Sequence, residues 1–570
     1  MIHIQRYDTM TYYRLLLCLS FSLAVTIGLS QSSYVVRSHP AAQTIDTLDV
    51  LHHTSEQLHS SNRRYAREDL LQVSNLADTS TLSNIDNASL NNIIKDNQGL
   101  EPYRERKGFL KHFYKNPVHL YQAETEDFSL VINPKLNIKL GYETESSELI
   151  FHNGRGLELY GALDNKIYFY TSFMENQSNF FNYQEPFIDE FQTVRGIGNF
   201  KTYQSSVFES ISGYDYGRAT AYFGVNISKH TKLELGHDRH FIGNGMRSLL
   251  LGDEGPNYFY LKFNARFWKF DYQTLFAELT SISAKSTPND NLLPKKFMAT
   301  HYLSYKPNPK FELGFFESIV FARENQFELQ YLNPVIFYRT VEFQLDSPDN
   351  VLLGLNLKYN PIKQVSLYGQ ILLDEFRADE IFSSRQWWGN KYGLQFGIKY
   401  YNVLGISNLD VQLEYNRVRP YTYSHREPTE EFPDVTVSNY SHSFQPLAHP
   451  LGANFTENII RVGYQPFPRL NFTFRFLSTR IGRDIDANYG SNVLRPDVTR
   501  VANFGNAQNQ GSLSNIRLVD LKASFRLFHN GFIDIDLLSR HDRNEDLGDI
   551  RTFYLGTGFR YNFSSSSIDY

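Results

Sequence analysis

Four consecutive side chains, His237, Asp238, Arg239 and His240, have the residue types of an acid–base or metal site. Such a site needs imidazole and carboxylate groups that converge on one point. His237 and His240 are three residues apart at the end of a predicted strand, where their side chains point in different directions. Metal binding or catalysis is therefore the least favoured interpretation of this cluster.

The residues that follow the cluster predict a loop. They combine turn-forming residues with a cation and a hydroxyl, namely Gly243, Asn244, Gly245, Arg247 and Ser248. Glycine and asparagine tolerate turn conformations, and the polar side chains can bond neighbouring strands. We interpret residues 237–248 as a structural motif whose loop folds inward and hydrogen-bonds the surrounding wall. Contact with a glycan is the alternative.

A second group of residues could bind a sugar. Trp387 and Trp388 begin a predicted strand after a long connection, and a further polar-aromatic stretch contains Arg419, Tyr421, Tyr423 and His425. Aromatic rings offer a flat apolar face with a polar edge, which suits stacking on a sugar ring. The alternative for the tryptophans is an aromatic belt at a membrane interface. We predict these six residues as glycan-binding candidates.

Other candidate catalytic groups do not form a convincing constellation. His425, His442 and His449 lie in or near one long connection, but no cysteine accompanies them and their spacing is wide. Asp374 and Glu375 would point to opposite faces of a strand, so they fail as a glycosidase pair. Phosphate-loop and dinucleotide fingerprints do not occur in their required context. We predict no enzymatic activity, no cofactor and no metal.

Two further carboxylates, Asp534 and Asp536, share one strand face. Lys522 and Arg526 on the preceding predicted strand balance their charge. We interpret this group as a salt-bridged lining of a lumen, in which each solvated pair contributes little to stability.

The composition determines which elements can position these residues. The chain has 570 residues, 15% aromatic residues and a mean hydropathy of −0.41. Frequent aromatic residues with negative hydropathy are typical of a transmembrane β-barrel, in which apolar residues occupy alternate positions. The formal net charge of −5 gives no basic excess, so we predict no nucleic-acid partner.

The N-terminus is expected to be an export signal. An apolar run over residues 15–29 follows Arg14, and small residues precede a predicted cleavage site before Gln31. The only cysteine, Cys18, lies inside this predicted signal peptide of residues 1–30. Residues 31–127 are predicted to form a polar, partly helical periplasmic or plug segment, with a loosely ordered lead-in as the equal alternative.

From about residue 136 the chain shows strand-like alternation of apolar and polar residues up to residue 563. About eighteen antiparallel strands are predicted, within a barrel domain of residues 128–563. Short turns alternate with long connections near 177–216, 239–256, 281–295, 322–350, 376–389, 421–454 and 481–514. Short turns at one rim and long loops at the other are typical of an outer-membrane barrel.

The last predicted strand, residues 551–563, must pair with the first, residues 136–143, because closure removes both sheet edges. A short C-terminal tail, residues 564–570, follows it. This tail either hangs in the periplasm, or Tyr570 competes with Phe563 as the terminal aromatic signal.

Four segments, residues 234–251, 387–391, 419–425 and 448–454, together resemble the Wzi-type capsule-assembly family. They are most similar to its Bacteroidetes branch, which includes RemB-like gliding-motility proteins. The resemblance covers about residues 45–563. It implies an eighteen-stranded outer-membrane barrel that holds or organises surface polysaccharide without catalysis.

The function expected from these observations is a non-enzymatic outer-membrane barrel that binds or organises capsular or exopolysaccharide. The alternatives are a component of the gliding-motility or secretion apparatus, supported by the branch resemblance, and a diffusion porin, permitted by the width of the barrel. The predicted partners are outer-membrane lipid and surface polysaccharide, together with motility or secretion proteins under the second hypothesis.

Overall fold

The computed structural model describes residues 33–52, 58–62, 64–77, 82–97, 112–114, 118–146, 148–164, 166–205, 212–281, 295–323, 327–345, 347, 349–375, 377–381, 383–425, 438–564 and 569–570. The predicted signal peptide and Cys18 lie outside these residues.

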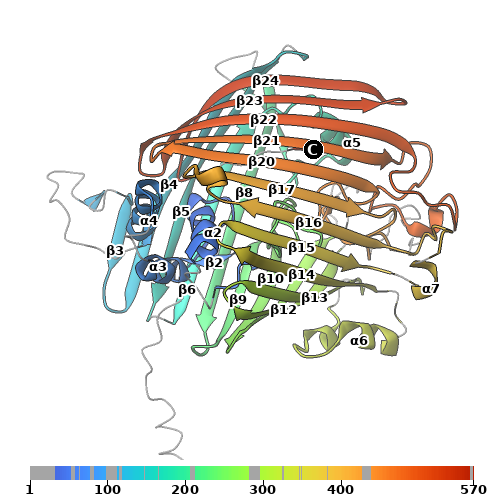
Figure 1. Ribbon diagram of the computed structural model, residues 1–570, viewed down its shortest axis with the longest axis horizontal. Helices are drawn as coiled ribbons and strands as arrows, with labels where there is room; N and C mark the ends of the chain where they lie inside the picture. The colour runs from blue at the N-terminus through green and yellow to red at the C-terminus, as the bar shows by residue number, and fades with distance from the viewer. Residues whose placement is uncertain are drawn as a thin grey trace, which may run out of the picture.

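Eighteen antiparallel strands form a closed barrel (Figure 1). They are β4 (Phe128–Glu143), β5 (Glu148–Leu163), β6 (Ile167–Ser178), β8 (Ser212–Asn226), β9 (Thr231–Asp238), β10 (Tyr258–Phe267), β11 (Phe270–Thr280), β12 (Lys295–Asn308), β13 (Phe311–Phe321), β14 (Asn350–Ile362), β15 (Val365–Leu373), β16 (Tyr392–Tyr400), β17 (Leu409–Val418), β20 (Phe455–Phe467), β21 (Leu470–Arg483), β22 (Ser512–Phe528), β23 (Gly531–Asn544) and β24 (Gly548–Tyr561). The short strands β3 (Tyr121–Glu124) and β7 (Lys201–Gln204) pair with β4 and β8.

The ring closes between β24 and β4, with register from Tyr554 opposite Glu143 to Tyr561 opposite Leu136. The predicted barrel and its closing partner, residues 136–143, are therefore confirmed. However, β4 begins at Phe128, eight residues before the predicted first strand. Pro134 lies in this additional part, which β24 does not reach, and an unpaired edge tolerates a residue without a backbone N–H.

The strand faces meet two environments. Alternate residues on the outer face are apolar and exposed, for example Leu521, Phe525, Ile533, Ile535, Phe553 and Leu555. Inward residues on the same strands are buried and polar, for example Asp520, Asp534, Asp536 and Arg560. A closed barrel with an apolar outer face satisfies every strand hydrogen bond and buries its polar side chains, as a bilayer requires.

The two rims differ. The connections at the rim that carries the start of β4 and the end of β24 are short, such as 268–269, 309–310, 363–364, 468–469 and 529–530. The opposite rim carries the seven predicted long connections and two short ones, 144–147 and 545–547. We call these the short-turn rim and the long-loop rim.

Three helices, α2 (Pro40–His52), α3 (Arg67–Leu76) and α4 (Asn84–Asn97), pack together at the short-turn rim (Figure 1). Asp86 and Asp96 bond the turn residues Asn408 and His529. Asp49 pairs with the inward Lys358 at 2.8 Å. The described helical segment thus lies across this mouth of the lumen. Among the described residues, no helix has the length and apolarity needed to span a membrane.

The β13–β14 connection covers part of the outer wall. It contains η4 (Leu329–Leu332) and α6 (Tyr338–Leu345), which lies outside the barrel in Figure 1. Its buried side chains, with their partners on β11–β14, are Phe276, Phe297, Ile319, Phe321, Tyr331, Tyr338 and Val341. The opposite face of this segment exposes Val335, Phe337 and Phe343. We call residues 327–345 the outer flap.

Candidate functional site

The β9–β10 connection, residues 239–257, folds into the lumen, and we call it the lumen loop. Its backbone N–H groups are held by side chains of the barrel wall. Glu414 on β17 accepts hydrogen bonds from the N–H of Met246 at 2.6 Å and of Arg247 at 3.0 Å. Gln370 on β15 accepts one from the N–H of Leu249 at 2.8 Å. Buried backbone N–H groups need such partners, so the wall determines the path of this loop.

Gly243 is required where the lumen loop meets the wall. Its φ of +144° lies in a region that side chains disfavour. A Cβ atom here would lie 2.4 Å from Nε2 of Gln370. The N–H of Gly243 donates to the carbonyl of Ser61, which joins the loop to the N-terminal segment.

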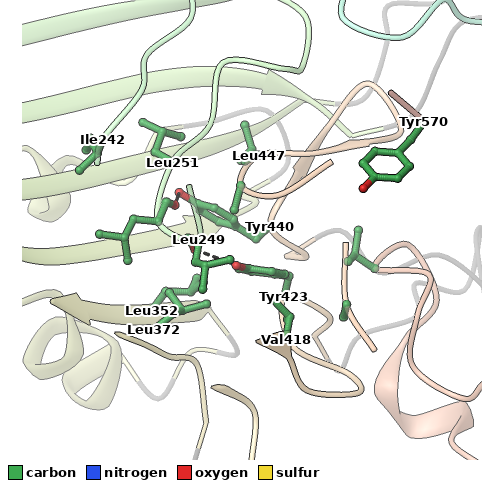
Figure 2. Packing of buried hydrophobic residues seen from close by; sticks show 14 of the residues in the cluster. Ile242, Leu249, Leu251, Leu352, Leu372, Val418, Tyr423, Tyr440, Leu447 and Tyr570 are labelled. Atoms are coloured by element: carbon green, nitrogen blue, oxygen red, sulfur yellow. Dashed lines mark hydrogen bonds between the residues drawn. The ribbon is translucent and has the colours of Figure 1, made fainter. Parts of the chain in front are cut away.

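The apolar centre of the lumen loop is Leu249, Leu250 and Leu251, which are fully buried. Figure 2 shows Tyr423 and Tyr440 approaching this centre from the long connection 419–454. Their hydroxyls donate to the carbonyls of Leu249 and Leu250 at 2.7 and 2.9 Å. These tyrosines therefore fasten the long connection onto the lumen loop.

The N-terminal segment completes this assembly from the other side. Glu312 on β13 accepts hydrogen bonds from the N–H groups of Ser60 and Ser61, both at 3.0 Å. Arg64 pairs with Asp238 at 2.8 Å and with Glu234 at 3.4 Å. Charged and hydroxyl groups of three segments far apart in the sequence thus fill this part of the lumen.

The side chains of the histidine cluster are separated. His237 is exposed, whereas His240 is buried against Tyr258 and Tyr260. Asp238 is engaged by Arg64, and Asn244 accepts from Asn356 and donates to Ser60, each at 2.9 Å. The hydroxyl of Ser248 donates to the carbonyl of Ile242 at 2.6 Å. The cluster therefore contributes to packing and hydrogen bonding and does not form one joint site.

At the long-loop rim, three connections pack into a loop layer formed by residues 374–391, 419–454 and 484–511. Lys391 is fully buried and pairs with Asp497 at 2.7 Å. Its ammonium also donates to the carbonyl of Ser424 at 2.9 Å. The ring of Trp388 lies under the guanidinium of Arg500 at 4.0 Å. Trp388 therefore belongs to the interior of this layer and not to an interfacial belt.

Five of the six predicted glycan-binding residues lie inside the loop layer. Arg419 donates to the carbonyl of Asn506 at 2.9 Å, and Tyr421 to that of Asn488 at 2.9 Å. The exposed fractions of Trp388, Arg419, Tyr421, Tyr423 and His425 are 7, 6, 1, 0 and 8%. Trp387 is only partly buried, with Arg377 5.5 Å from its ring. Trp387 therefore has the accessible aromatic face of this group.

The carboxylates Asp374 and Glu375 follow the end of β15 and belong to the loop layer. Burial raises the pKa of Asp374 to about 7, with the charge of Glu375 adding to the effect and Lys391 opposing it. Burial also opposes ionisation of Glu375, but Lys391 and His425 outweigh it and lower the pKa of Glu375 to about 2. Asp374 accepts the N–H of Tyr423 at 2.7 Å. The two acids have different protonation behaviour and serve to hold the layer together.

The remaining histidines are each bound separately. His442 accepts the N–H of Thr280 at 2.9 Å, and His449 lies 2.8 Å from Glu457. Within the described part of the chain, no group of three or more histidines, cysteines and acids is close enough to hold a metal ion.

The lining charges predicted on β22 and β23 are present, with one change of partner. Asp536 pairs with Lys522 at 3.1 Å, but Asp534 pairs with Arg560 on β24 at 2.6 Å and not with the predicted Arg526. The described end of the tail, Asp569 and Tyr570, does not hang in the periplasm as the first alternative proposed, whereas the role of Tyr570 as a terminal signal stays a prediction. Asp569 lies inside the lumen against Arg247 and Arg475, at 2.5 and 2.9 Å, and Tyr570 bonds Glu457 and Thr479 there.

Two large cavities that no sequence pattern indicated remain within the lumen. One, of about 280 Å³, lies toward the long-loop rim between β4–β8, β22–β24 and the lumen loop. The other, of about 510 Å³, lies between helices α2 and α4 and the wall strands β17 and β20–β23. Both are bordered by Arg247 and Asp569. The sequence indicated this lining only through the charged residues at the alternate, inward-facing positions of the strands.

Comparison with solved structures supports the fold. The Escherichia coli outer-membrane protein Wzi, which is involved in group 1 capsule assembly and described as a carbohydrate-binding β-barrel, superposes with a TM-score of 0.57 and 13% identity, over 94% of this chain and 100% of that chain. Pseudomonas aeruginosa OccK1 (OpdK) gives a TM-score of 0.42 and 11% identity, over 77% and 99% of the two chains.

Comparison with curated proteins gives no match. A family model, described as capsule assembly protein Wzi, matches residues 210–529. This range contains the lumen loop, the outer flap and the loop layer. The match covers more than half of the chain, and the fold and the family model agree. The chain therefore belongs to the Wzi capsule-assembly family.

Proposed function

We propose that this protein binds surface polysaccharide at the outer face of the outer membrane during assembly of a capsule or a related extracellular layer. The observation that carries the proposal is the family match over residues 210–529. These residues contain the lumen loop and the segments that form the loop layer. The carbohydrate binding described for the Escherichia coli protein of the same fold supports it.

The arrangement of the loop layer favours binding over catalysis. Its buried polar groups are engaged with partners inside the barrel, as in the pairs of Lys391 with Asp497 and of His449 with Glu457 on β20. A catalytic acid or base must reach a substrate proton, whereas a binding surface needs rigid aromatic and polar groups. In this proposal Trp387 contacts the glycan directly. Trp388, Arg419, Tyr421, Tyr423 and His425 hold the surface in shape.

The proposal is tested with the purified, folded barrel and the capsular or exopolysaccharide of the organism that encodes it. We expect binding that falls when Trp387→Ala removes the accessible ring, while the exposed Trp268→Ala at the short-turn rim leaves binding unchanged. A deletion strain should lose polysaccharide from its surface. Absence of binding, together with an unchanged surface layer in the deletion strain, would refute the proposal.

A role in gliding motility or secretion is the alternative, and it rests on the similarity of four segments to RemB-like proteins of the Bacteroidetes branch. Three of these segments, residues 387–391, 419–425 and 448–454, lie in the loop layer, where a protein partner could reach the layer's surface. A clean deletion scored for both surface polysaccharide and spreading separates the two functions. Loss of spreading with an intact polysaccharide layer would favour the alternative.

A further inference from the structure

Three arginines border the smaller lumenal cavity without a carboxylate partner. Arg195 lies in the β6–β8 connection, Arg218 on β8 and Arg239 at the start of the lumen loop. Among the described residues, none of the three has an aspartate or glutamate oxygen within 4.0 Å, as the ion pairs of the chain show. Arg218 and Arg239 donate only to the carbonyls of Gly196 and Gly255.

Two of these guanidinium groups, those of Arg218 and Arg239, converge on one place. A point 1.5 Å from the Cα of Gly196, where a Cβ would be, lies 3.7 Å from Nη2 of Arg218 and also 3.7 Å from Nη1 of Arg239. Arg195 is the adjacent residue and borders the same cavity, but its guanidinium lies over the ring of Phe187 at 3.8 Å, with its Nε buried without a hydrogen-bond partner. Nε2 of His152, in the same lining, is buried without a partner as well.

The carboxylates around this cavity are already neutralised by other cations. Asp569 is held by Arg247 and Arg475, and Asp536 by Lys522. Glu254 lies 3.4 Å from Arg247, and Asp520 lies 2.6 Å from Arg475. Asp238 and Asp253 also act on Arg218, but they already pair with Arg64 and Arg37. The charge of the three arginines is therefore only partly compensated locally, which is costly in a partly desolvated site. Burial, with Arg483 and Arg540 nearby, lowers the pKa of Arg195 to about 10.

The cavity also has the shape and lining of a sugar subsite. Its volume of about 280 Å³ is close to the lower end of ligand pockets, about 300–1,000 Å³. The rings of Phe180 and Tyr216 are stacked 6.0 Å apart on its wall. Its lining runs from Phe563, beyond the end of β24, to Gln445 and Pro450 of the long-loop rim. The cavity therefore reaches the rim from which surface polysaccharide would come.

We propose that this cavity binds a carboxylate-bearing sugar, such as a uronic acid unit of an acidic polysaccharide, with Arg218 and Arg239 as its anion-binding groups and Arg195 adding positive charge at its border. A guanidinium fork matches a carboxylate in a planar, two-point contact, and aromatic walls suit a sugar ring. The inference rests on the proposed polysaccharide binding and adds the charge class of the ligand.

The test uses the full folded chain in detergent and calorimetric titration with two probes. These are trigalacturonate and the neutral trisaccharide made by reducing its carboxyl groups to alcohols. We expect wild type to bind trigalacturonate at least tenfold more tightly than the neutral probe, and to lose affinity as salt increases. Arg218→Gln should lower the affinity for trigalacturonate about tenfold or more, because charge-assisted hydrogen bonds are the strong ones, and Arg218→Gln with Arg239→Gln should lower it further.

The matched control is Arg543→Gln, which removes the same charge from β23 at a side chain that is 69% exposed and lies outside the cavity. Its affinity should stay within twofold of wild type. The Arg218 and Arg239 variants lose no ion pair, only a hydrogen bond each to the carbonyls of Gly196 and Gly255. Their thermal midpoints should therefore fall by only a few degrees, with the barrel still folded, which separates lost binding from lost folding.

Equal binding of the two probes by wild type would overturn this inference and leave the proposed function standing. Unchanged affinity in the folded double variant would overturn it as well. If neither probe binds, the inference fails, and titration with the native polysaccharide then decides whether the proposed function fails with it.

Discussion

At the residue scale, carboxylates inside this barrel act mainly on its own loops. Glu414 and Glu312 each accept two backbone N–H groups from segments that are far away in the sequence. An ionised acceptor makes stronger hydrogen bonds than a neutral one. Single inward-facing acids thereby select one path for the lumen loop and one for the N-terminal segment.

Glu414→Gln should loosen the lumen loop. The glutamine amide group offers hydrogen-bond donors where Met246, Arg247 and Tyr368 already donate. We expect the unfolding free energy to fall by about 1.5–3 kcal/mol, the usual contribution of a hydrogen bond to a charged group. Limited proteolysis should then cut within residues 239–257. Glu175→Gln, at a half-exposed acid paired with Arg155, is the control. Equal protease resistance of wild type and the Glu414 variant would contradict this role.

The raised pKa of Asp374 predicts that the stability contributed by the loop layer depends on pH. Its pKa in the folded chain, about 7, lies above the value of about 3.9 in an unfolded chain. Folding therefore favours the protonated form. Its contribution to stability is fully present below about pH 4 and is lost as the pH rises through 7. Between pH 5 and 8 wild type should lose on the order of 2 kcal/mol in unfolding free energy through this group.

Asp374→Asn imitates the protonated acid and keeps an oxygen for the N–H of Tyr423. The variant should therefore show a flatter dependence of the thermal midpoint on pH between 5 and 8, and a higher midpoint at pH 8. Asp379→Asn, at an exposed acid of the same connection, should keep the wild-type slope. A steep slope in both variants would assign the pH dependence to another group.

At the element scale, period-two alternation was sufficient to predict most of the barrel. It predicted eighteen strands, the seven long connections and the pairing of β24 with β4, because a strand between lipid and a polar lumen must alternate. It did not predict the first half of β4, residues 128–135. It also could not predict the partners of the lumen loop, since Arg247 and Glu414 are 167 residues apart. Their contact depends on the closed ring.

The glycan-binding candidates were likewise predictable from the sequence only in part. Composition identified Trp387, Trp388 and the stretch around Tyr421 and Tyr423 as unusual. Whether an aromatic residue in a loop faces solvent or the interior depends on which other connections cover it, and local sequence carries no signal for that. The outer flap was likewise not anticipated, because its apolar residues follow no strand pattern.

We expect the outer flap to contact the bilayer in addition to the apolar outer face of the strands. Its exposed Val335, Phe337 and Phe343 continue the apolar outer wall, so we expect them to face lipid. Because the only cysteine lies in the predicted signal peptide, Phe343→Cys provides a unique attachment site for a nitroxide label. In reconstituted protein the label should be accessible to oxygen and protected from a water-soluble nickel complex.

Val501→Cys is the control, since Val501 is exposed on the loop layer. A label at this position should be accessible to the nickel complex. Equal accessibility of both labels to the nickel complex would show that the flap stands in water.

At the scale of the whole molecule, the described part of the lumen is occupied from both ends. Helices α2–α4 lie across the short-turn rim, and the lumen loop with its tyrosine contacts lies behind the long-loop rim. An eighteen-stranded barrel without such contents is wide enough for an aqueous channel. The filling therefore argues against a simple diffusion porin.

Planar-bilayer recordings test this conclusion. Wild type should show no large, stable conductance. A variant without residues 33–97, in which a short Gly-Ser linker also replaces residues 243–252, should conduct, because both obstacles are removed while the strands remain. A stable conductance of wild type as large as that of the variant would restore the porin hypothesis.

The strands are of unequal length around the ring. β5 and β22 have 16 and 17 residues, whereas β9 has 8 and β15 has 9. With about 3.4 Å per residue and a tilt of about 40°, the long strands reach roughly 44 Å and the 9-residue strand roughly 23 Å, against an apolar band of about 25 Å. The long strands of one half of the barrel therefore extend roughly 20 Å beyond the apolar band, through the headgroup layer and into the water.

The outward residues near the top of that half are polar and exposed, as Arg543, Asp549 and Arg551 show. The cavity with the three arginines lies against this half, beside β4–β8 and β22–β24. A polysaccharide chain that leaves the cavity on this side would run along a rigid sheet that stands in water, clear of the lipid surface. The height of these long strands would then determine the direction in which the polysaccharide extends from the cell surface.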